Sequence, residues 1–125
     1  MNALVFIAVA LAGGIGAASR LWLDARIRAV TSGNYPVGTM VINVAGSFLI
    51  GTAAGLGAAR GLPESWLMVI EVGLFGGFTT FSTISVETIA LVRERRHGTA
   101  VVVALGLLVV AVLAAAAGLW IGAHL

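Results

Sequence analysis

The sequence has few charged residues and no cysteine. Only 10% of its 125 residues are Asp, Glu, Lys or Arg, whereas soluble domains have about 25%. Hydrophobic residues make up 60% of the chain, and the mean hydropathy is +1.10. This composition excludes a water-soluble surface and predicts a membrane protein in contact with lipid. Without cysteine, neither disulfides nor thiolate metal sites can form.

Two further classes of function have no support in the sequence. The net charge is +2, but the chain has no basic groove or aromatic platform for nucleic acid, so we expect no nucleic-acid partner. No pair of His or carboxylate residues has the spacing of metal ligands. We therefore expect that the chain is not an enzyme.

Four apolar stretches are long enough to cross a bilayer, which takes about 20 mostly apolar residues as a helix. Short connections join them and leave no room for a second domain. The sequence therefore predicts an all-α membrane protein, with a single four-helix transmembrane domain over residues 1–125. The predicted spans are approximately residues 3–21, 36–59, 67–92 and 99–121.

The positions of the arginines predict the orientation, because positive charge near span ends stays on the cytoplasmic side. The loops after the first and third spans share one face, and the opposite face has only Arg60. We therefore expect a multi-pass protein of the plasma (inner) membrane with both termini outside. The arginines of the two inner loops are Arg26, Arg28, Arg93, Arg95 and Arg96.

A run of glycines and hydroxyls, residues 76–83, interrupts the third apolar span. Within hydrocarbon, a helix can be interrupted only where the freed backbone groups face protein, water or an ion. Isolated hydroxyls in membrane helices often bond the carbonyl one turn back, but four hydroxyls beside a Gly-Gly pair exceed that pattern. The run predicts a third helix that is broken at Gly76–Thr80 and lines a polar path.

Three other polar residues lie within or near the spans. Asn43 is central in the second span, where the alternative to a functional role is an interhelical hydrogen bond worth about 0.6 kcal/mol. Arg20 either extends from a helix end to water or draws anions into a vestibule. Glu87 lies beyond the hydroxyls, and it can be protonated, paired with an arginine or hydrated.

The chemistry of the polar path favours a small anion. The path has N–H and O–H donors and no fixed negative charge, and the edge of a phenylalanine ring is electropositive. A strongly hydrated anion enters only where such donors replace its water. One subunit of four helices is too thin to enclose the path, so we expect a partner subunit.

Three motifs are similar to those of the Fluc (CrcB-like) fluoride channels. They are Gly16-Ala17-Ala18-Ser19-Arg20 in the first span, residues 38–48 in the second and residues 76–82 in the third. The resemblance covers the whole chain. It implies passive fluoride export, a double-barrelled dimer of antiparallel subunits with dual topology, and a structural sodium ion at the dimer interface.

The resemblance also implies roles for single residues. Asn43 would donate its amide N–H to fluoride, Phe81 would present a ring edge, and Ser82 and Thr83 would supply hydroxyls. Arg20, Thr39 and Glu87 would belong to the vestibule. The backbone carbonyls of Gly76 and Thr79 would hold the sodium ion.

The chain departs from the family pattern in two places. Ile84 stands where the family has a second phenylalanine, and residues 100–121 contain no Tyr, Ser or Thr for the pore wall. The arginine bias also favours a single orientation. We therefore predict a heterodimer with an oppositely oriented paralogue, and otherwise a homodimer.

Two alternatives to a conducting subunit are open. The first is a non-conducting scaffold subunit of such a channel, which the two departures from the family pattern favour. The second is a small multidrug antiporter, although that class needs a carboxylate in the first span and residues 3–21 have none.

Overall fold

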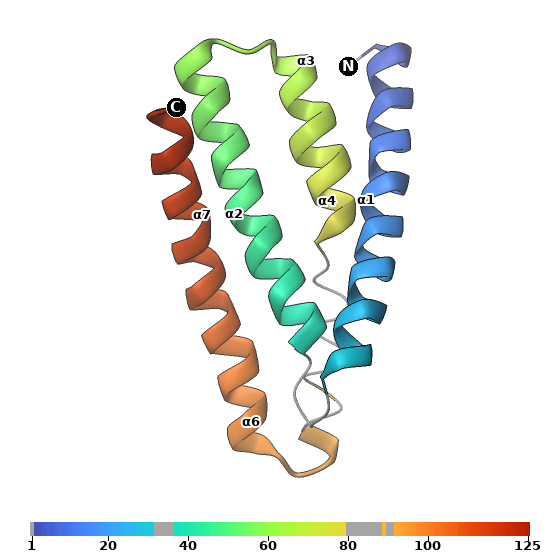
Figure 1. The fold of residues 1–125 in the computed structure, drawn as a ribbon, viewed down its shortest axis with the longest axis vertical. Helices are drawn as coiled ribbons and strands as arrows, with labels where there is room; N and C mark the ends of the chain where they lie inside the picture. Colours follow the sequence, from blue (N-terminus) through green and yellow to red (C-terminus); the bar gives the residue numbers. More distant parts are fainter. Residues whose placement is uncertain (1, 32–36, 80–88, 90–91) are drawn as a thin grey trace.

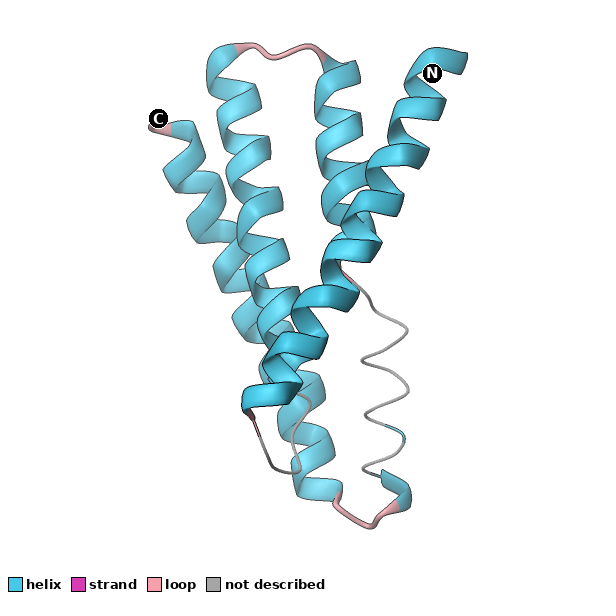
Figure 2. Ribbon diagram, turned by 45° about the vertical axis from the view of Figure 1, so that its right-hand side comes forward, coloured by secondary structure: helices cyan, strands magenta, loops and turns pink. Residues whose placement is uncertain are grey.

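The computed structural model describes residues 2–31, 37–79, 89 and 92–125, and the structural statements below concern these residues. Within them every regular element is a helix and no strand occurs (Figure 2). The predicted all-α class is confirmed.

The helices form four rods that lie side by side (Figure 1). The chain alternates in direction between the rods, so that both termini and the connection between α2 and α3 lie at the same end. The elements are α1 (Ala3–Val30), α2 (Val37–Arg60), α3 (Glu64–Leu67), η1 (Met68–Phe75), α4 (Gly76–Phe78), α6 (His97–Val101), η2 (Val102–Gly106) and α7 (Leu107–Ala123). In η1 and η2 the chain makes wider π-helical turns.

Three helices of the described residues are long and apolar enough to cross a membrane, namely Ala3–Val30, Val37–Arg60 and His97–Ala123. Their outer faces carry many exposed Leu, Ile and Val side chains. In water such faces would be unfavourable, but they suit contact with lipid. The helices fit the predicted multi-pass membrane protein.

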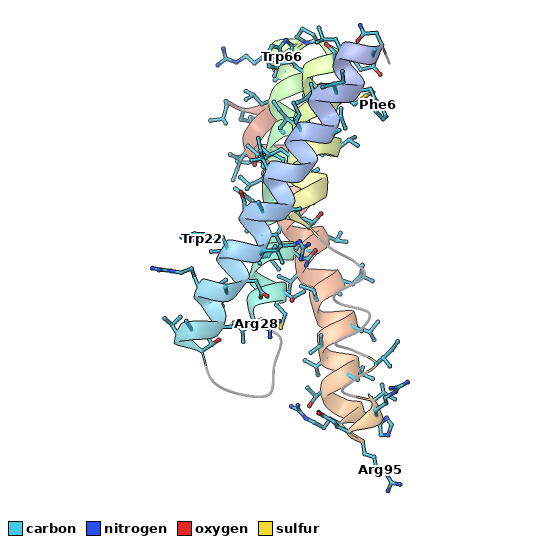
Figure 3. The ribbon with its side chains drawn as sticks, turned by 90° about the vertical axis from the view of Figure 1, so that its right-hand side faces the viewer. Phe6, Trp22, Arg28, Trp66 and Arg95 are labelled. Atoms are coloured by element: carbon cyan, nitrogen blue, oxygen red, sulfur yellow. The ribbon has the colours of Figure 1, made fainter. Side chains whose placement is uncertain are left out.

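Aromatic and charged side chains lie toward the ends of the rods. Figure 3 shows Phe6 and Trp66 toward one end of the structure, and Arg28 and Arg95 toward the other. Trp66 is exposed at the start of the third rod, as expected for an aromatic ring at a membrane interface.

Helix α1 continues past Leu21, where its predicted apolar span ends, as far as Val30. The additional turns are polar and carry their own stabilising pair, because Arg28 Nε donates to Asp24 Oδ2 at 2.8 Å. Pairs of opposite charge four residues apart stabilise a helix. The end of α1 is therefore a charged extension of an apolar helix.

Glycines let α2 and α7 pack backbone to backbone. A Cβ added at Gly118 would lie 2.9 Å from the amide nitrogen of Thr52, and one at Gly55 would lie 2.8 Å from that of Ala123. Real Cβ atoms essentially never come this close to other atoms. Glycines at four-residue spacing, Gly51 with Gly55 on α2 and Gly118 with Gly122 on α7, therefore serve close packing, as in other membrane helix pairs.

Glycines also let α1 pack closely against the third rod. A Cβ at Gly16 would lie 2.9 Å from the amide nitrogen of Phe78, and one at Gly77 would lie 3.0 Å from the carbonyl carbon of Gly13. The glycine-rich stretch of the first span therefore holds the end of α4 against α1.

Candidate functional site

Thr39 and Asn43 are the two buried polar side chains among the described residues, with 3% and 8% of their surface exposed. They lie one turn apart on α2, and Asn43 Nδ2 donates to the backbone carbonyl of Thr39 at 2.9 Å. Asn43 therefore faces the protein interior and not lipid.

The end of the third rod lies against α2 close to Asn43. A Cβ at Gly46 would lie 3.3 Å from Cδ1 of Phe78 and closer still to Cγ2 of Thr79. Gly46 is three residues beyond Asn43 on the same helix, which is about one turn. The absence of a side chain at Gly46 thus brings Thr79 to within about a turn of Asn43 along α2.

Thr79 ends the continuous helical stretch Glu64–Phe78 of the third rod. Helix α4 ends at Phe78, and Thr79 has the extended angles φ −86° and ψ 157°. Its amide and its hydroxyl both donate to the carbonyl of Phe75, at 3.0 and 3.1 Å. This hydroxyl therefore bonds the carbonyl one turn back, as isolated hydroxyls in membrane helices often do.

The conformation of Thr79 suits a cation ligand. Because its backbone is extended, its carbonyl is turned out of the direction that helical carbonyls share. Carbonyls freed in this way bind sodium in broken membrane helices. Among the described residues, no three His, Asp or Glu side chains gather as a metal site, and a carbonyl-held sodium ion needs none.

Several predicted site residues lie outside the described residues. They are Phe81, Ser82, Thr83 and Glu87, together with Ile84, at which the chain departs from the family pattern. The roles assigned to them stay predictions.

Arg20 lies on α1 with its Nε buried and without a hydrogen-bond partner in the described structure. One turn further, Asp24 has a buried Oδ1 that is likewise unpartnered there. The Asp24 carboxylate packs against Gly38, where an added Cβ would be 3.2 Å from Cγ and closer still to Oδ1. Since Gly38 precedes Thr39, this contact brings the charged end of α1 to the predicted vestibule.

Sequence reasoning missed Asp24 and Gly46 as site residues. Asp24 could have been found from its spacing, since it lies four residues from both Arg20 and Arg28. Gly46 has no comparable local signal, because the chain contains 17 glycines and only the packing of two helices selects this one.

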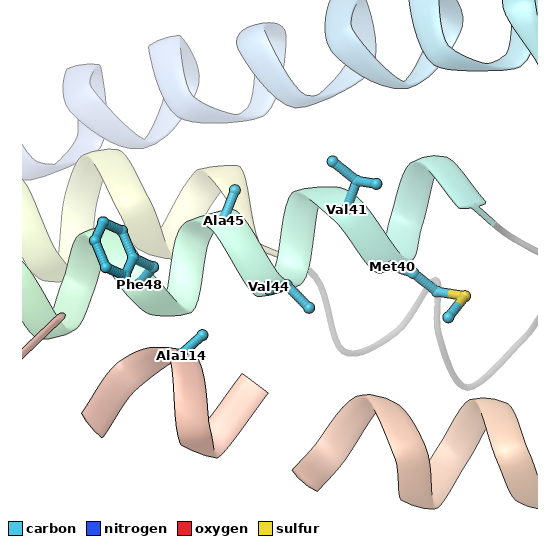
Figure 4. Close-up of a pocket in the computed structure, with 6 residues that line it drawn as sticks. All are labelled: Met40, Val41, Val44, Ala45, Phe48 and Ala114. Carbon is cyan, nitrogen blue, oxygen red and sulfur yellow. The ribbon is translucent and has the colours of Figure 1, made fainter. Parts of the chain in front are cut away.

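A groove opens on the face shared by α2 and α7 (Figure 4). The fourth span contributes only Ala114 to its lining. Among the lining residues that the structure describes, no side chain carries an N–H or O–H donor that could replace the water of an anion. They are Met40, Val41, Val44, Ala45, Phe48 and Ala114.

The family described as "CrcB-like protein, Camphor Resistance (CrcB)" matches residues 7–119 of the chain. This match covers most of the sequence, including α2 and its buried polar pair. The chain belongs to the CrcB-like family. The match agrees with the resemblance seen in the three motifs of the sequence.

Relatives of known name are similar over almost the whole chain. "Fluoride-specific ion channel FluC 1" of Leifsonia xyli subsp. xyli is 43% identical over 98% of this chain and 89% of its own length. "Fluoride-specific ion channel FluC" of Novosphingobium aromaticivorans is 42% identical over 98% of this chain and 94% of its own. "Fluoride-specific ion channel FluC 3" of Bifidobacterium longum is 39% identical over 94% of this chain and 98% of its own length. These are names of ion channels, which confirms the expectation that the chain is not an enzyme.

Proposed function

We propose that the chain is a subunit of a fluoride-selective channel that lets fluoride leave the cytoplasm passively across the plasma membrane. The observation that carries this proposal is the similarity, over 98% of the chain, to a relative named as a fluoride-specific ion channel. The burial of Thr39 and Asn43 in a helix apolar enough to cross a membrane supports it, since buried polar groups in such helices mark ion pathways.

In this proposal, neutral donors replace the water around fluoride. Asn43 supplies an amide N–H, Phe81 supplies a ring edge, and Ser82 and Thr83 supply hydroxyls. Neutral donors bind the anion weakly enough for it to leave again, which conduction requires. Arg20, Thr39 and Glu87 belong to the vestibule that precedes these groups.

The break in the third helix and the sodium ion are part of the same proposal. Within the predicted range Gly76–Thr80, residues Gly76–Phe78 are helical, so we place the interruption at Thr79. The carbonyls of Gly76 and Thr79 would hold a structural sodium ion at the dimer interface. The extended backbone of Thr79 supports this assignment. Sodium, when bound, fixes the freed carbonyls and so keeps the interrupted segment in one conformation.

The channel is an antiparallel dimer, and its second subunit is an oppositely oriented paralogue. The arginine bias supports a single orientation for this chain, with both termini outside. The groove on α2 and α7 has an apolar lining, so this face needs polar pore groups from elsewhere. Several relatives have numbered names, FluC 1, FluC 2 and FluC 3, as expected where one organism has more than one such protein.

A non-conducting scaffold subunit is the second candidate, and the apolar groove favours it. In that case the paralogue would supply the conducting residues and this chain would stabilise the dimer. The multidrug antiporter has no support among the relatives, whose names are those of ion channels.

Fluoride efflux from liposomes tests these functions, with a fluoride electrode as the detector. We expect no flux from the chain alone and fast, chloride-excluding flux when the paralogue is co-expressed. Flux from the chain alone, carried by antiparallel homodimers, would disprove the heterodimer but not the channel. Absence of flux from both preparations would disprove the channel.

The variant Asn43→Ala separates a conducting subunit from a scaffold. A hydrogen bond to a charged group is worth about 1.5–3 kcal/mol, so we expect fluoride flux to fall by about tenfold or more. The control is Thr52→Ala, which removes a hydroxyl bonded to the carbonyl of Phe48 within the same helix. Unchanged flux in Asn43→Ala, with the dimer intact, would support the scaffold.

A further inference from the structure

The charged end of α1 carries an acidic side chain beside the start of α2. Arg20, Asp24 and Arg28 follow one another at four-residue spacing and share one side of the helix. Asp24 Oδ2 accepts from Arg28 at 2.8 Å. Its Oδ1 is buried, has no hydrogen-bond partner in the described structure and lies against Gly38.

The Asp24 carboxylate lies beside the start of helix α2. The first N–H groups of a helix lack intrahelical acceptors, and the helix dipole favours negative charge there. Gly38 is in the first turn of α2, so Asp24 places a fixed negative charge where a mobile anion would otherwise be attracted. Thr39, which follows Gly38, belongs to the predicted vestibule.

The contact between Asp24 and Gly38 depends on the glycine. A Cβ at Gly38 would come within 3.2 Å of Cγ of Asp24 and nearer to Oδ1. Any larger residue at this position would force the carboxylate away from α2. The sequence thus combines a glycine on one helix with an aspartate on the other, and the pair places the charge.

We propose that Asp24 is a rate- and affinity-determining residue of the vestibule. Its carboxylate lowers the affinity for fluoride of the entrance between the end of α1 and the start of α2, which we call the α1–α2 mouth. This inference rests on the proposed channel function. The carboxylate offsets the attraction of Arg20 and of the start of α2, so that fluoride passes this mouth without being held there. Tight binding at a mouth slows conduction, and a fixed negative charge prevents it.

The test compares Asp24→Asn with a matched control. Asparagine keeps the shape of the side chain and an oxygen that can accept from Arg28, but it removes the charge. The control is Glu94→Gln, which removes the same charge from an exposed side chain whose nearest cation, Arg96, is 3.8 Å away. Fluoride flux into liposomes is measured over a range of fluoride concentrations, in the subunit combination that conducts.

We expect the half-saturating fluoride concentration to fall about two- to fivefold in Asp24→Asn, because the partly exposed Asp24 side chain (23% exposed) acts on fluoride partly through water, which weakens the interaction of unit charges. The difference should shrink when potassium gluconate raises the ionic strength from about 0.01 M to about 1 M, because screening shortens from about 30 Å to about 3 Å. Glu94→Gln should leave the half-saturating concentration unchanged.

Three outcomes would overturn the inference. The first is an unchanged half-saturating concentration in Asp24→Asn while the wild type conducts, which leaves the channel function standing. The second is an equal fall in both variants, which would make the effect one of general surface charge. The third is the absence of wild-type flux, which would remove the channel function as well. If Asp24→Asn does not assemble, Asp24→Ser replaces it, with the same expected direction.

Discussion

The variant Gly118→Ala tests the packing of α2 against α7. A Cβ at this position would lie 2.9 Å from the Thr52 nitrogen and 3.0 Å from Thr52 Oγ1, and closer still to the carbonyl oxygen of Phe48. Ordinary van der Waals contact begins at about 3.4 Å. Two of these three atoms are backbone atoms in the middle of a helix, so they cannot rotate away.

The magnitude follows from how the two helices meet. Since α2 cannot yield locally, α7 must move outward, and its neighbouring glycine contacts are lost as well. On α2, Gly51 would place a Cβ 2.9 Å from the carbonyl carbon of Ala115, and on α7, Gly122 would place one 2.8 Å from the Leu56 nitrogen. Overpacking of one methyl group typically costs about 1–3 kcal/mol. We expect the loss in the free energy of unfolding to lie toward the upper end of this range, because all these glycine contacts belong to the one interface between α2 and α7.

The assay is reversible unfolding in mixed micelles, followed by tryptophan fluorescence. The matched control is Gly106→Ala, because it makes the same substitution in the same rod at a position with nothing within 4 Å of the new Cβ. We expect Gly118→Ala to lower the free energy of unfolding by about 2–3 kcal/mol and Gly106→Ala to leave it unchanged or slightly raised. Equal effects of the two substitutions would refute the reasoning.

Two further predictions concern the site and the orientation. Gly46→Ala should reduce fluoride flux several-fold without loss of the dimer, because the new Cβ displaces Thr79. The control Gly14→Ala, which has open space around its new Cβ, should conduct normally. Equal flux in both variants would show that the position of Thr79 is unimportant. Because the chain has no cysteine, single-cysteine variants report topology directly. In intact cells a membrane-impermeant maleimide should label Glu64→Cys and not Glu94→Cys, and labelling of both would contradict a single orientation.

The burial of one predicted site residue could be expected from local sequence. A polar residue inside an apolar span is costly unless it is buried or functional, and this alone indicated Asn43, which the structure finds buried in α2. The four-residue spacing of Gly51 with Gly55 and of Gly118 with Gly122 is typical of positions where membrane helices pack closely. Which residues these glycines pack against could not be predicted, because the spacing carries no information about the partner helix.

The sequence by itself determined the all-α fold class, because this class depends on local composition: apolar stretches of sufficient length form helices that satisfy their own backbone groups in lipid. The tertiary structure alone decided which surfaces meet. Helices that are apolar on all sides have no hydrophobic face to set their rotation, so no pattern predicts that Gly46 contacts Thr79 or that Asp24 contacts Gly38. Those contacts follow from close backbone packing between helices distant in sequence, and they place the candidate vestibule.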